Sequence, residues 1–212
     1  MCRFKSGIIF KTRCVVAPGE NDSHSDLLRE LNVEDTYANA SRMFVRAELV
    51  PENNEWWTNP DFWKYVVDQD VTPDWYDTDP GKYEEEFRQA VKAWWGEHVL
   101  VDRKIDELSS GYYRMKRCEV KKLLNDVKVY LDSSTVGEMW GSSTVRKMYS
   151  SSTVGEMHDS STVGEMWGSS TVRKMYSSST ARDFKNYPNI KIHIPKGGKF
   201  EMVEHEEKKP CD

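Results

Sequence analysis

Residues Ser133–Asn186 read SSTVGEMWG, SSTVRKMYS, SSTVGEMHD, SSTVGEMWG, SSTVRKMYS and SSTARDFKN, which are nine-residue units without an insertion. A short repeat of constant length buries the apolar side of each unit against its neighbours, and this is typical of a solenoid. The sequence therefore predicts a β-solenoid over residues 126–195, preceded by an α+β domain over residues 1–125. A C-terminal cap and tail is expected over residues 196–212.

Within each unit the constant Val and Met stand three residues apart, as in Val136 and Met139. Strict alternation along a strand cannot place both side chains on one face. We therefore expect a turn at the variable Gly-Glu or Arg-Lys pair and a strand over Met139–Val145. The inward residues of that strand would be Met139, Gly141, Ser143 and Val145, and the outward residues Trp140, Ser142 and Thr144.

The size of one coil is indicated by the charges at the sixth position of the unit. Two units would close an 18-residue, two-sheet roll, in which Glu156 lies beside Lys174 and Lys147 beside Glu165. Three units would close a triangular coil that stacks like charges, which is less favourable. The pattern favours the two-sheet roll. The segment SSTVGEMWGSSTVRKMYSSST recurs exactly after 27 residues, so the triangular coil remains an alternative. A duplication of coding sequence also explains this recurrence.

Aromatic residues at the eighth position of the unit are expected on the solenoid surface. Trp140, His158 and Tyr176 would form a ladder on one sheet, and Tyr149 and Trp167 would form another on the second sheet. Such ladders stabilise neighbouring strands. The alternatives are ligand stacking and a homo-oligomer formed through the solenoid.

The N-terminal domain carries signals for strands and capped helices. We expect strands over Gly7–Val16 and Phe44–Pro51, and a helix over Ser25–Leu31 that is capped by Asp22 or Ser23. Asn59-Pro60 and Asp79-Pro80 each predict the start of a further helix, because a capping residue is followed by proline. In the second of these helices, the apolar face comprises Tyr83, Phe87, Val91 and Trp94.

The formal net charge of −5 conceals a strongly acidic region. Glu48–Glu86 holds 12 acidic residues and only two bases, Lys64 and Lys82. This imbalance argues against nucleic-acid binding and suits a partner protein with a basic surface, or a small cationic ligand. No stretch reaches the 18 or so apolar residues that span a bilayer, so we expect no membrane association and a cytoplasmic protein.

The candidate binding surface combines acids with tryptophans: Trp56, Trp57, Asp68, Asp70, Asp74, Trp75 and Asp77. Clustered carboxylates attract hard cations, but Pro73 occupies the position where a calcium loop requires glycine. The four cysteines are scattered without CxxC spacing, which favours neither a zinc ribbon nor a disulfide framework. We therefore expect no metal site and no cofactor.

An alternative function rests on Cys2, which becomes N-terminal if Met1 is removed. A thiol beside a free amine is the nucleophile of N-terminal-nucleophile hydrolases. His24 would act as the base and Asp26 would orient it, because both lie in the polar segment Asn21–Asp26.

The segments FKSGII, ENDSHSDLL, FVRAEL and VDQDVTPDW, followed by SSTV-x-x-M units, resemble an uncharacterised family of bacteriophage and prophage proteins. The resemblance carries no established activity, but small phage proteins often serve host takeover or counter-defence, which implies such a role in the cytoplasm of an infected or lysogenic bacterium. From the acidic, tryptophan-rich surface we expect a non-enzymatic binding or inhibitor protein. A structural spacer in a phage particle is a further alternative.

Overall fold

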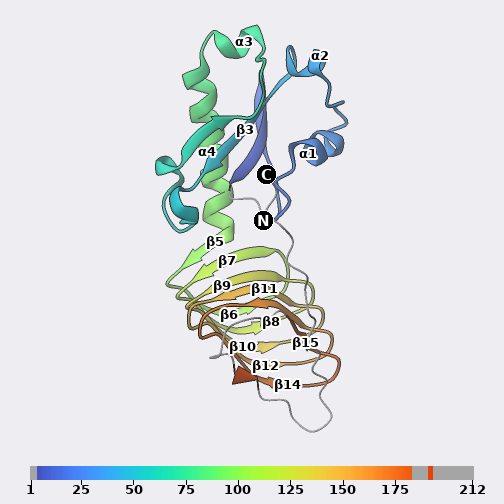
Figure 1. The fold of residues 1–212 in the computed structure, drawn as a ribbon, viewed down its shortest axis with the longest axis vertical. Helices are drawn as coiled ribbons and strands as arrows, with labels where there is room; N and C mark the ends of the chain where they lie inside the picture. The colour runs from blue at the N-terminus through green and yellow to red at the C-terminus, as the bar shows by residue number, and fades with distance from the viewer. Residues whose placement is uncertain (1–3, 183–190, 193–212) are drawn as a thin grey trace. The chain divides into compact units, whose positions relative to one another are not determined.

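The structure, a computed structural model, describes residues 4–182 and 191–192. The chain divides into two units, one ending at Val99 and the other beginning at Leu100. The N-terminal unit is a mixture of helices and antiparallel strands, and the C-terminal unit is a β-solenoid (Figure 1). This confirms the predicted fold class of an α+β region followed by a solenoid.

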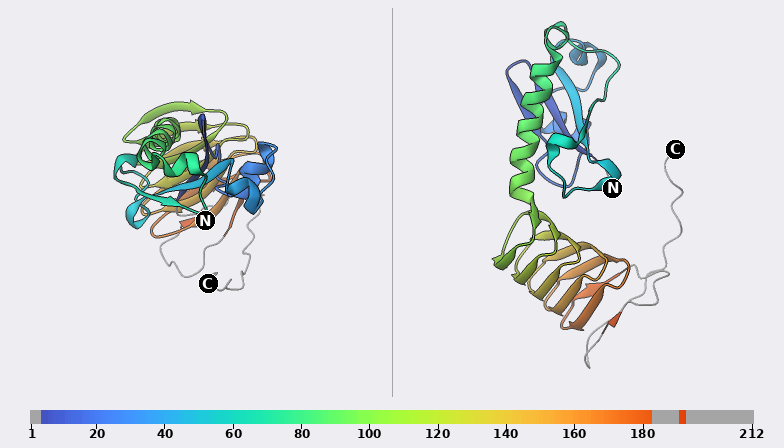
Figure 2. Two further views of the ribbon diagram at one scale, coloured as in Figure 1. Left: turned by 90° about the horizontal axis from the view of Figure 1, so that it is seen from above. Right: turned by 90° about the vertical axis from the view of Figure 1, so that its left-hand side faces the viewer.

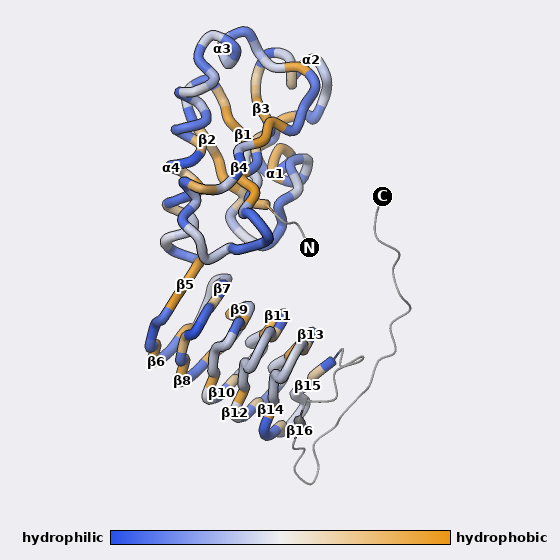
Figure 3. Tube along the Cα trace, turned by 60° about the vertical axis from the view of Figure 1, so that its left-hand side comes forward, coloured by the Kyte–Doolittle hydropathy of each residue, from blue (hydrophilic) through white to orange (hydrophobic). Residues whose placement is uncertain are grey.

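The N-terminal unit is built on an antiparallel sheet of order β2-β1-β3-β4. The strands are β1 (Lys5–Phe10), β2 (Arg13–Val16), β3 (Phe44–Val50) and β4 (Lys64–Val67). The helices are α1 (His24–Glu30), α2 (Tyr37–Ala40), α3 (Asp74–Asp77) and α4 (Pro80–His98), with the 3-10 turns η1 (Glu52–Asn54) and η2 (Pro60–Phe62). Figure 3 shows that apolar residues concentrate on the strands of this sheet.

Both faces of the sheet are covered. Ile8 and Phe44 pack with Leu27 and Leu28 of α1 on one face. On the other face α4 packs against β1 and β2, and Gly7 leaves the room that the Phe87 ring fills, because a Cβ there would lie 2.6 Å from that ring. Burial on both faces explains why β1 is buried along almost its whole length.

Several local predictions are confirmed. Ser23 caps α1 by accepting from the Asp26 amide, and Asp79 caps α4 by accepting from the Lys82 amide. The predicted apolar face of α4 is buried, and so are Val45, Ala47 and Leu49 of β3. These elements are encoded by short-range signals, namely a capping side chain, a proline at the first helical position and a regular apolar spacing.

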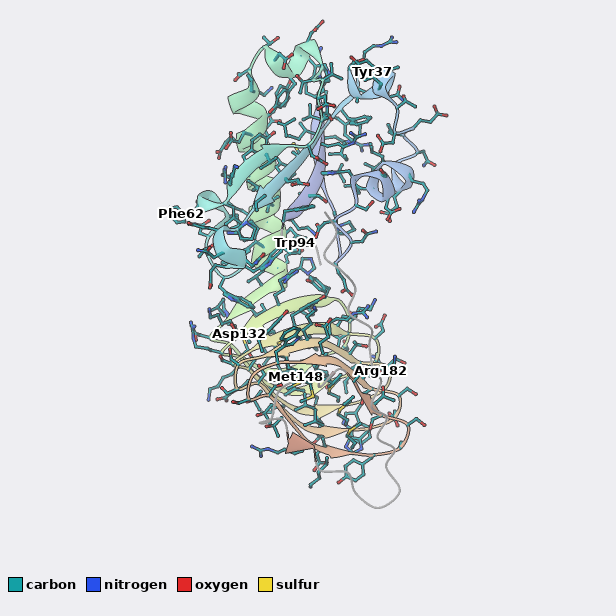
Figure 4. The ribbon with its side chains drawn as sticks, viewed as in Figure 1. Tyr37, Phe62, Trp94, Asp132, Met148 and Arg182 are labelled. Carbon is teal, nitrogen blue, oxygen red and sulfur yellow. The ribbon has the colours of Figure 1, made fainter. Side chains whose placement is uncertain are left out.

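Two local predictions are wrong. The predicted strand Gly7–Val16 is a hairpin of β1 and β2, and the helix expected after Asn59-Pro60 is only η2, followed by β4. Lys64–Val67 pairs antiparallel with β3, so the backbone hydrogen bonds of this β-branched, aromatic segment go to the sheet. Figure 4 shows Phe62 projecting from this turn, where it is 81% exposed.

The solenoid consists of two parallel sheets, ordered β16-β14-β12-β10-β8-β6 and β15-β13-β11-β9-β7-β5 (Figure 2). The first contains β6 (Lys104–Leu108), β8 (Glu119–Leu123), β10 (Thr135–Met139), β12 (Thr153–Met157), β14 (Thr171–Met175) and β16 (Lys191–Ile192). The second contains β5 (Val99–Val101), β7 (Tyr112–Lys116), β9 (Lys128–Asp132), β11 (Thr144–Tyr149), β13 (Thr162–Met166) and β15 (Thr180–Ala181).

Two units make one coil, as the charge pattern predicts. Thr135 pairs with Thr153 and Thr153 with Thr171, so the stacking period is eighteen residues. Lys174 donates to Glu156 at 2.8 Å, and the Lys147 ammonium lies 2.6 Å from the Glu165 carboxylate. The prediction of a two-sheet roll is therefore confirmed, and the triangular coil is excluded.

The predicted position of the strand within the unit is wrong. The strands cover Thr-Val-x-x-Met, and the turn follows Met, where Gly141, Ser150 and Asp159 have positive φ angles of 66°, 57° and 55°. The ladder pairs the first, second, fourth and fifth strand residues and passes over the third. This irregularity lets Val and Met share the inner face although they are three residues apart, a possibility that strict alternation excludes.

The inward residues of the unit are nevertheless mostly those expected. Val145 and Met148 are fully buried, and so is Ser143 in the turn before the strand. Met148 lies between the two sheets in Figure 4. The apolar positions therefore form one continuous core along the coils.

The parallel ladders begin at Val99 rather than at residue 126. Val120 and Leu123 stand in register with Val136 and Met139, and Ile105 and Leu108 stand in register with Val120 and Leu123. The first coils have apolar residues at the same positions but lack the Ser-Ser-Thr sequence. A search for the nine-residue repeat in the sequence therefore does not find them. The predicted strand over YPNIKIHIP lies outside the described residues except for β16, and the expected cap over 196–212 lies wholly outside them.

Candidate functional site

A buried ion pair lies beside the first strand. Lys5 is fully buried, and its ammonium lies 2.8 Å from Asp22 Oδ1 and donates to the Gly19 carbonyl at 2.9 Å. The same ammonium stands 4.2 Å from the centroid of the Trp94 ring, and Asp22 accepts from the Ser6 amide. Buried charges require such partners. The pair therefore anchors the chain that leads into α1.

His24, the first residue of α1, lies against the middle of the sheet and is only 8% exposed. Its Nε2 lies 3.2 Å from the Ala47 carbonyl, and its Nδ1 lies 3.1 Å from Asp68 Oδ2. Glu48 follows Ala47 in β3, and Asp68 follows β4 with its amide bonded to the Arg46 carbonyl. One ligand atom from each of His24, Glu48 and Asp68 lies within 4.8 Å of the others.

Glu48 is the group in this cluster with a strongly perturbed acidity. Burial, reinforced by the negative charges of Asp68 and Asp22, raises the pKa of the Glu48 carboxyl to about 7. A desolvated carboxylate among like charges favours its neutral form. Within the described residues, the Glu48 carboxylate therefore has no stabilising positive charge in its surroundings.

Cys2 of the predicted catalytic trio lies outside the described residues. The two ring nitrogens of His24 face the Ala47 carbonyl and Asp68 rather than Asp26. Asp26 accepts from the Asn21 amide at 2.8 Å and binds the Arg29 guanidinium at 2.6 Å, and these contacts lower the pKa of its carboxyl. Asp68, and not Asp26, lies against the His24 ring. The prediction that Asp26 orients this ring is therefore wrong.

The two described cysteines have the properties of structural thiols. Burial raises the pKa of Cys14 to about 11, with a contribution from Glu86. Burial also raises the pKa of Cys118, whose thiol donates to the Leu100 carbonyl at 3.3 Å. Neither resembles an activated nucleophile, which requires a lowered pKa.

The predicted acidic surface exists, although its tryptophans are mainly structural. Asp70, Asp74 and Asp77 are exposed, and we call these three residues the acidic segment. Trp56 is only 5% exposed and packs edge-on against Trp63 and Trp94, so it is a core residue and not a binding residue.

The other two predicted binding tryptophans, Trp57 and Trp75, are half-buried. Trp75 donates from Nε1 to the Arg42 carbonyl at 2.9 Å and packs on Tyr83 at a ring distance of 4.9 Å. Its ring therefore helps to hold α3 against α4, directly beside the acidic segment.

The aromatic residues of one solenoid sheet form the expected ladder. The rings of Trp140 and His158 stack at 3.9 Å, and those of His158 and Tyr176 at 4.7 Å, both nearly parallel. Tyr149 and Trp167 stand on the other sheet and are partly exposed. Trp140 and Trp167 donate from Nε1 to Glu138 and Glu165 on their own strands. The rings thus bind mainly to their own sheet.

Sequence reasoning marked His24 and Asp68 separately and missed their contact. It also missed Lys5, Asp22 as its partner, and Glu48 as part of the cluster. The available signal was a lysine at the start of an otherwise apolar strand. The pairing of Ser6 with Glu48 between β1 and β3 places these groups together.

Comparisons with family models, curated proteins and solved structures give no match to this chain. Within residues 4–182 and 191–192, no helix has both the length and the apolar character needed to cross a membrane.

Proposed function

We propose that the protein is a non-enzymatic binding protein whose acidic segment engages a basic surface on a partner protein. In the phage setting that the sequence resemblance implies, the partner is a host protein, and the role is inhibition during host takeover or counter-defence in the bacterial cytoplasm. The solenoid serves as a rigid mount for the N-terminal unit and offers a surface for self-association.

The observation that carries this proposal is the contrast between paired and unpaired carboxylates. Within the described residues, Asp70, Asp74 and Asp77 have no lysine or arginine at ion-pair distance. Elsewhere in the same unit such pairs are frequent: Asp26 with Arg29, Asp35 with Arg46, Asp61 with Lys92, and Glu84 with Arg88. Exposed charges of one sign attract a partner of the opposite sign and raise its association rate.

The acidic segment is also held in place. Trp75 anchors α3 through its bond to Arg42, and Tyr76 stacks on Tyr83 at 5.7 Å. The Thr72 hydroxyl donates to Asp77 at 2.6 Å. A rigid surface loses less conformational entropy on binding than a flexible one. The segment is therefore better suited to specific recognition than to nonspecific charge attraction.

The solenoid supports the role of a mount. Its constant Val and Met residues are buried in the core, and the rings of Trp140, His158 and Tyr176 stack on one another. Core packing thus explains the constant Val and Met residues, and ring stacking explains the aromatic residues of one sheet. No described contact of His24 or Asp26 favours the hydrolase alternative.

The test is quantitative affinity capture from bacterial lysate with the full chain. The triple variant Asp70→Asn, Asp74→Asn, Asp77→Asn is compared with a control that neutralises three other exposed acids, Glu30→Gln, Glu34→Gln and Glu97→Gln. Both variants change the net charge equally. The proposal expects a defined protein to be lost with the first variant and retained with the second. Equal capture by both variants would contradict it.

A further inference from the structure

The hydrogen bonding of His24 leaves one ring nitrogen facing a carboxylate. A backbone carbonyl only accepts, so Nε2 must carry the proton that is donated to Ala47 at 3.2 Å. In the neutral imidazole Nδ1 is then an unprotonated acceptor. That nitrogen lies 3.1 Å from Asp68 Oδ2, which is also an acceptor. Two acceptors at this distance are held together either by a further proton or by a cation bound between them.

The charges around the cluster point the same way. Glu48 and Asp68 both contribute carboxylates, and within the described chain neither has a lysine or arginine at ion-pair distance. The nearest candidates are engaged elsewhere: Lys5 pairs with Asp22, and Arg46 pairs with Asp35. A divalent cation at this position would contact both carboxylates and the ring nitrogen, because one ligand atom of each residue lies within 4.8 Å of the others.

We propose that His24 Nδ1 and the carboxylates of Glu48 and Asp68 bind a divalent transition-metal ion of the zinc type. Nitrogen ligation by imidazole favours such ions over Mg²⁺ and Ca²⁺, which prefer oxygen. Donation from the other ring nitrogen to a backbone carbonyl is the arrangement that orients metal-binding histidines. Three protein ligands, one of them on exposed Asp68, leave a coordination position for water.

The ligands come from three separate elements, α1, β3 and the end of β4, so an ion would cross-link the helix to the sheet. This proposal is independent of partner binding by the acidic segment. Its test uses Glu48 and Asp68, and the partner test uses Asp70, Asp74 and Asp77. Failure of one therefore leaves the other standing.

The test is calorimetric titration of Zn²⁺ into the full chain after dialysis against a chelator. Glu48→Gln and Asp68→Asn remove a ligand charge at nearly constant volume, and Glu52→Gln, which neutralises an exposed acid outside the cluster, is the matched control. We expect one zinc ion whose affinity falls about tenfold or more in the first two variants and is unchanged in the third. Zinc should raise the melting temperature of the wild type and of Glu52→Gln by more than that of the two ligand variants.

Two results would overturn the proposal. One is the absence of saturable zinc binding by the wild type. The other is zinc binding of equal affinity in Glu48→Gln and Asp68→Asn, since the ion would then sit on other residues, such as the cysteines. Circular dichroism of the metal-free variants establishes that they are folded before titration.

Discussion

Lys147 of β11 and Glu165 of β13 occupy the same position in successive coils of one sheet, and their charged groups lie 2.6 Å apart. The two residues are eighteen positions apart in the sequence, which is the length of one coil. Their opposite charges therefore indicate the coil size. The same relation recurs on the other sheet between Glu156 and Lys174.

Reversing one member of this pair should destabilise the solenoid. Lys147→Glu places two glutamates side by side, and we expect a loss of about 0.5–1 kcal/mol in the free energy of unfolding. The double variant Lys147→Glu, Glu165→Lys should recover most of the loss. Denaturant unfolding measures both, and a double variant no better than the single one would contradict the assigned register.

Truncating a core methionine should have a larger effect. Met157 is fully buried between the sheets, and Met157→Ala removes side-chain volume that the stacked coils cannot refill. We expect a loss of about 2–5 kcal/mol. Glu156→Gln, one residue earlier on the outer face, is the control and should cost less than about 1 kcal/mol. Similar losses in both variants would show that the strand faces are misassigned.

The buried ion pair of the N-terminal unit predicts an asymmetric response. Asp22→Asn removes the carboxylate that pairs with fully buried Lys5, and we expect a loss of about 3–5 kcal/mol. The double variant Lys5→Met, Asp22→Asn removes both charges and should be markedly more stable than the single variant. Chemical denaturation of both proteins tests this, and equal stabilities would mean that the pair is not desolvated.

The acidity of Cys14 predicts slow alkylation. With its pKa raised to about 11, only about one thiol in a thousand is ionised at pH 8. We expect iodoacetamide to leave Cys14 largely unmodified at pH 8 and to react faster as the pH approaches 11 or when the protein is unfolded. Peptide mass spectrometry follows the reaction. Rapid modification of Cys14 in the folded protein at pH 8 would contradict its raised pKa.

Elements that depend on neighbouring residues were predictable from the sequence. The Ser23 and Asp79 caps, the buried face of α4 and the alternation of β3 need only a few residues of context. The coil size was predictable because the sixth residue of the unit has opposite charges at a spacing of eighteen residues, as in Lys147 and Glu165. The strand position was not, since the ladder passes over its third residue and so breaks the alternation on which the prediction rested.

The candidate metal cluster could be predicted only in fragments. His24 and Asp68 both stood out as chemically suited side chains, but forty-four residues and two strands separate them. Their contact depends on His24 lying against Ala47 of β3 and on β4 pairing with β3, and neither relation has a local signal. Asp26 was nearer in the sequence and therefore preferred, yet it turns toward Arg29.

The acidic segment as the binding surface is the central claim, and it is tested most directly by the salt dependence of the affinity for the captured partner. We predict that the triple variant of Asp70, Asp74 and Asp77 binds the partner at least about tenfold more weakly than the wild type at low salt. The difference from the wild type should shrink as added NaCl screens the exposed charges. Equal dissociation constants for the two proteins at every salt concentration would contradict the claim.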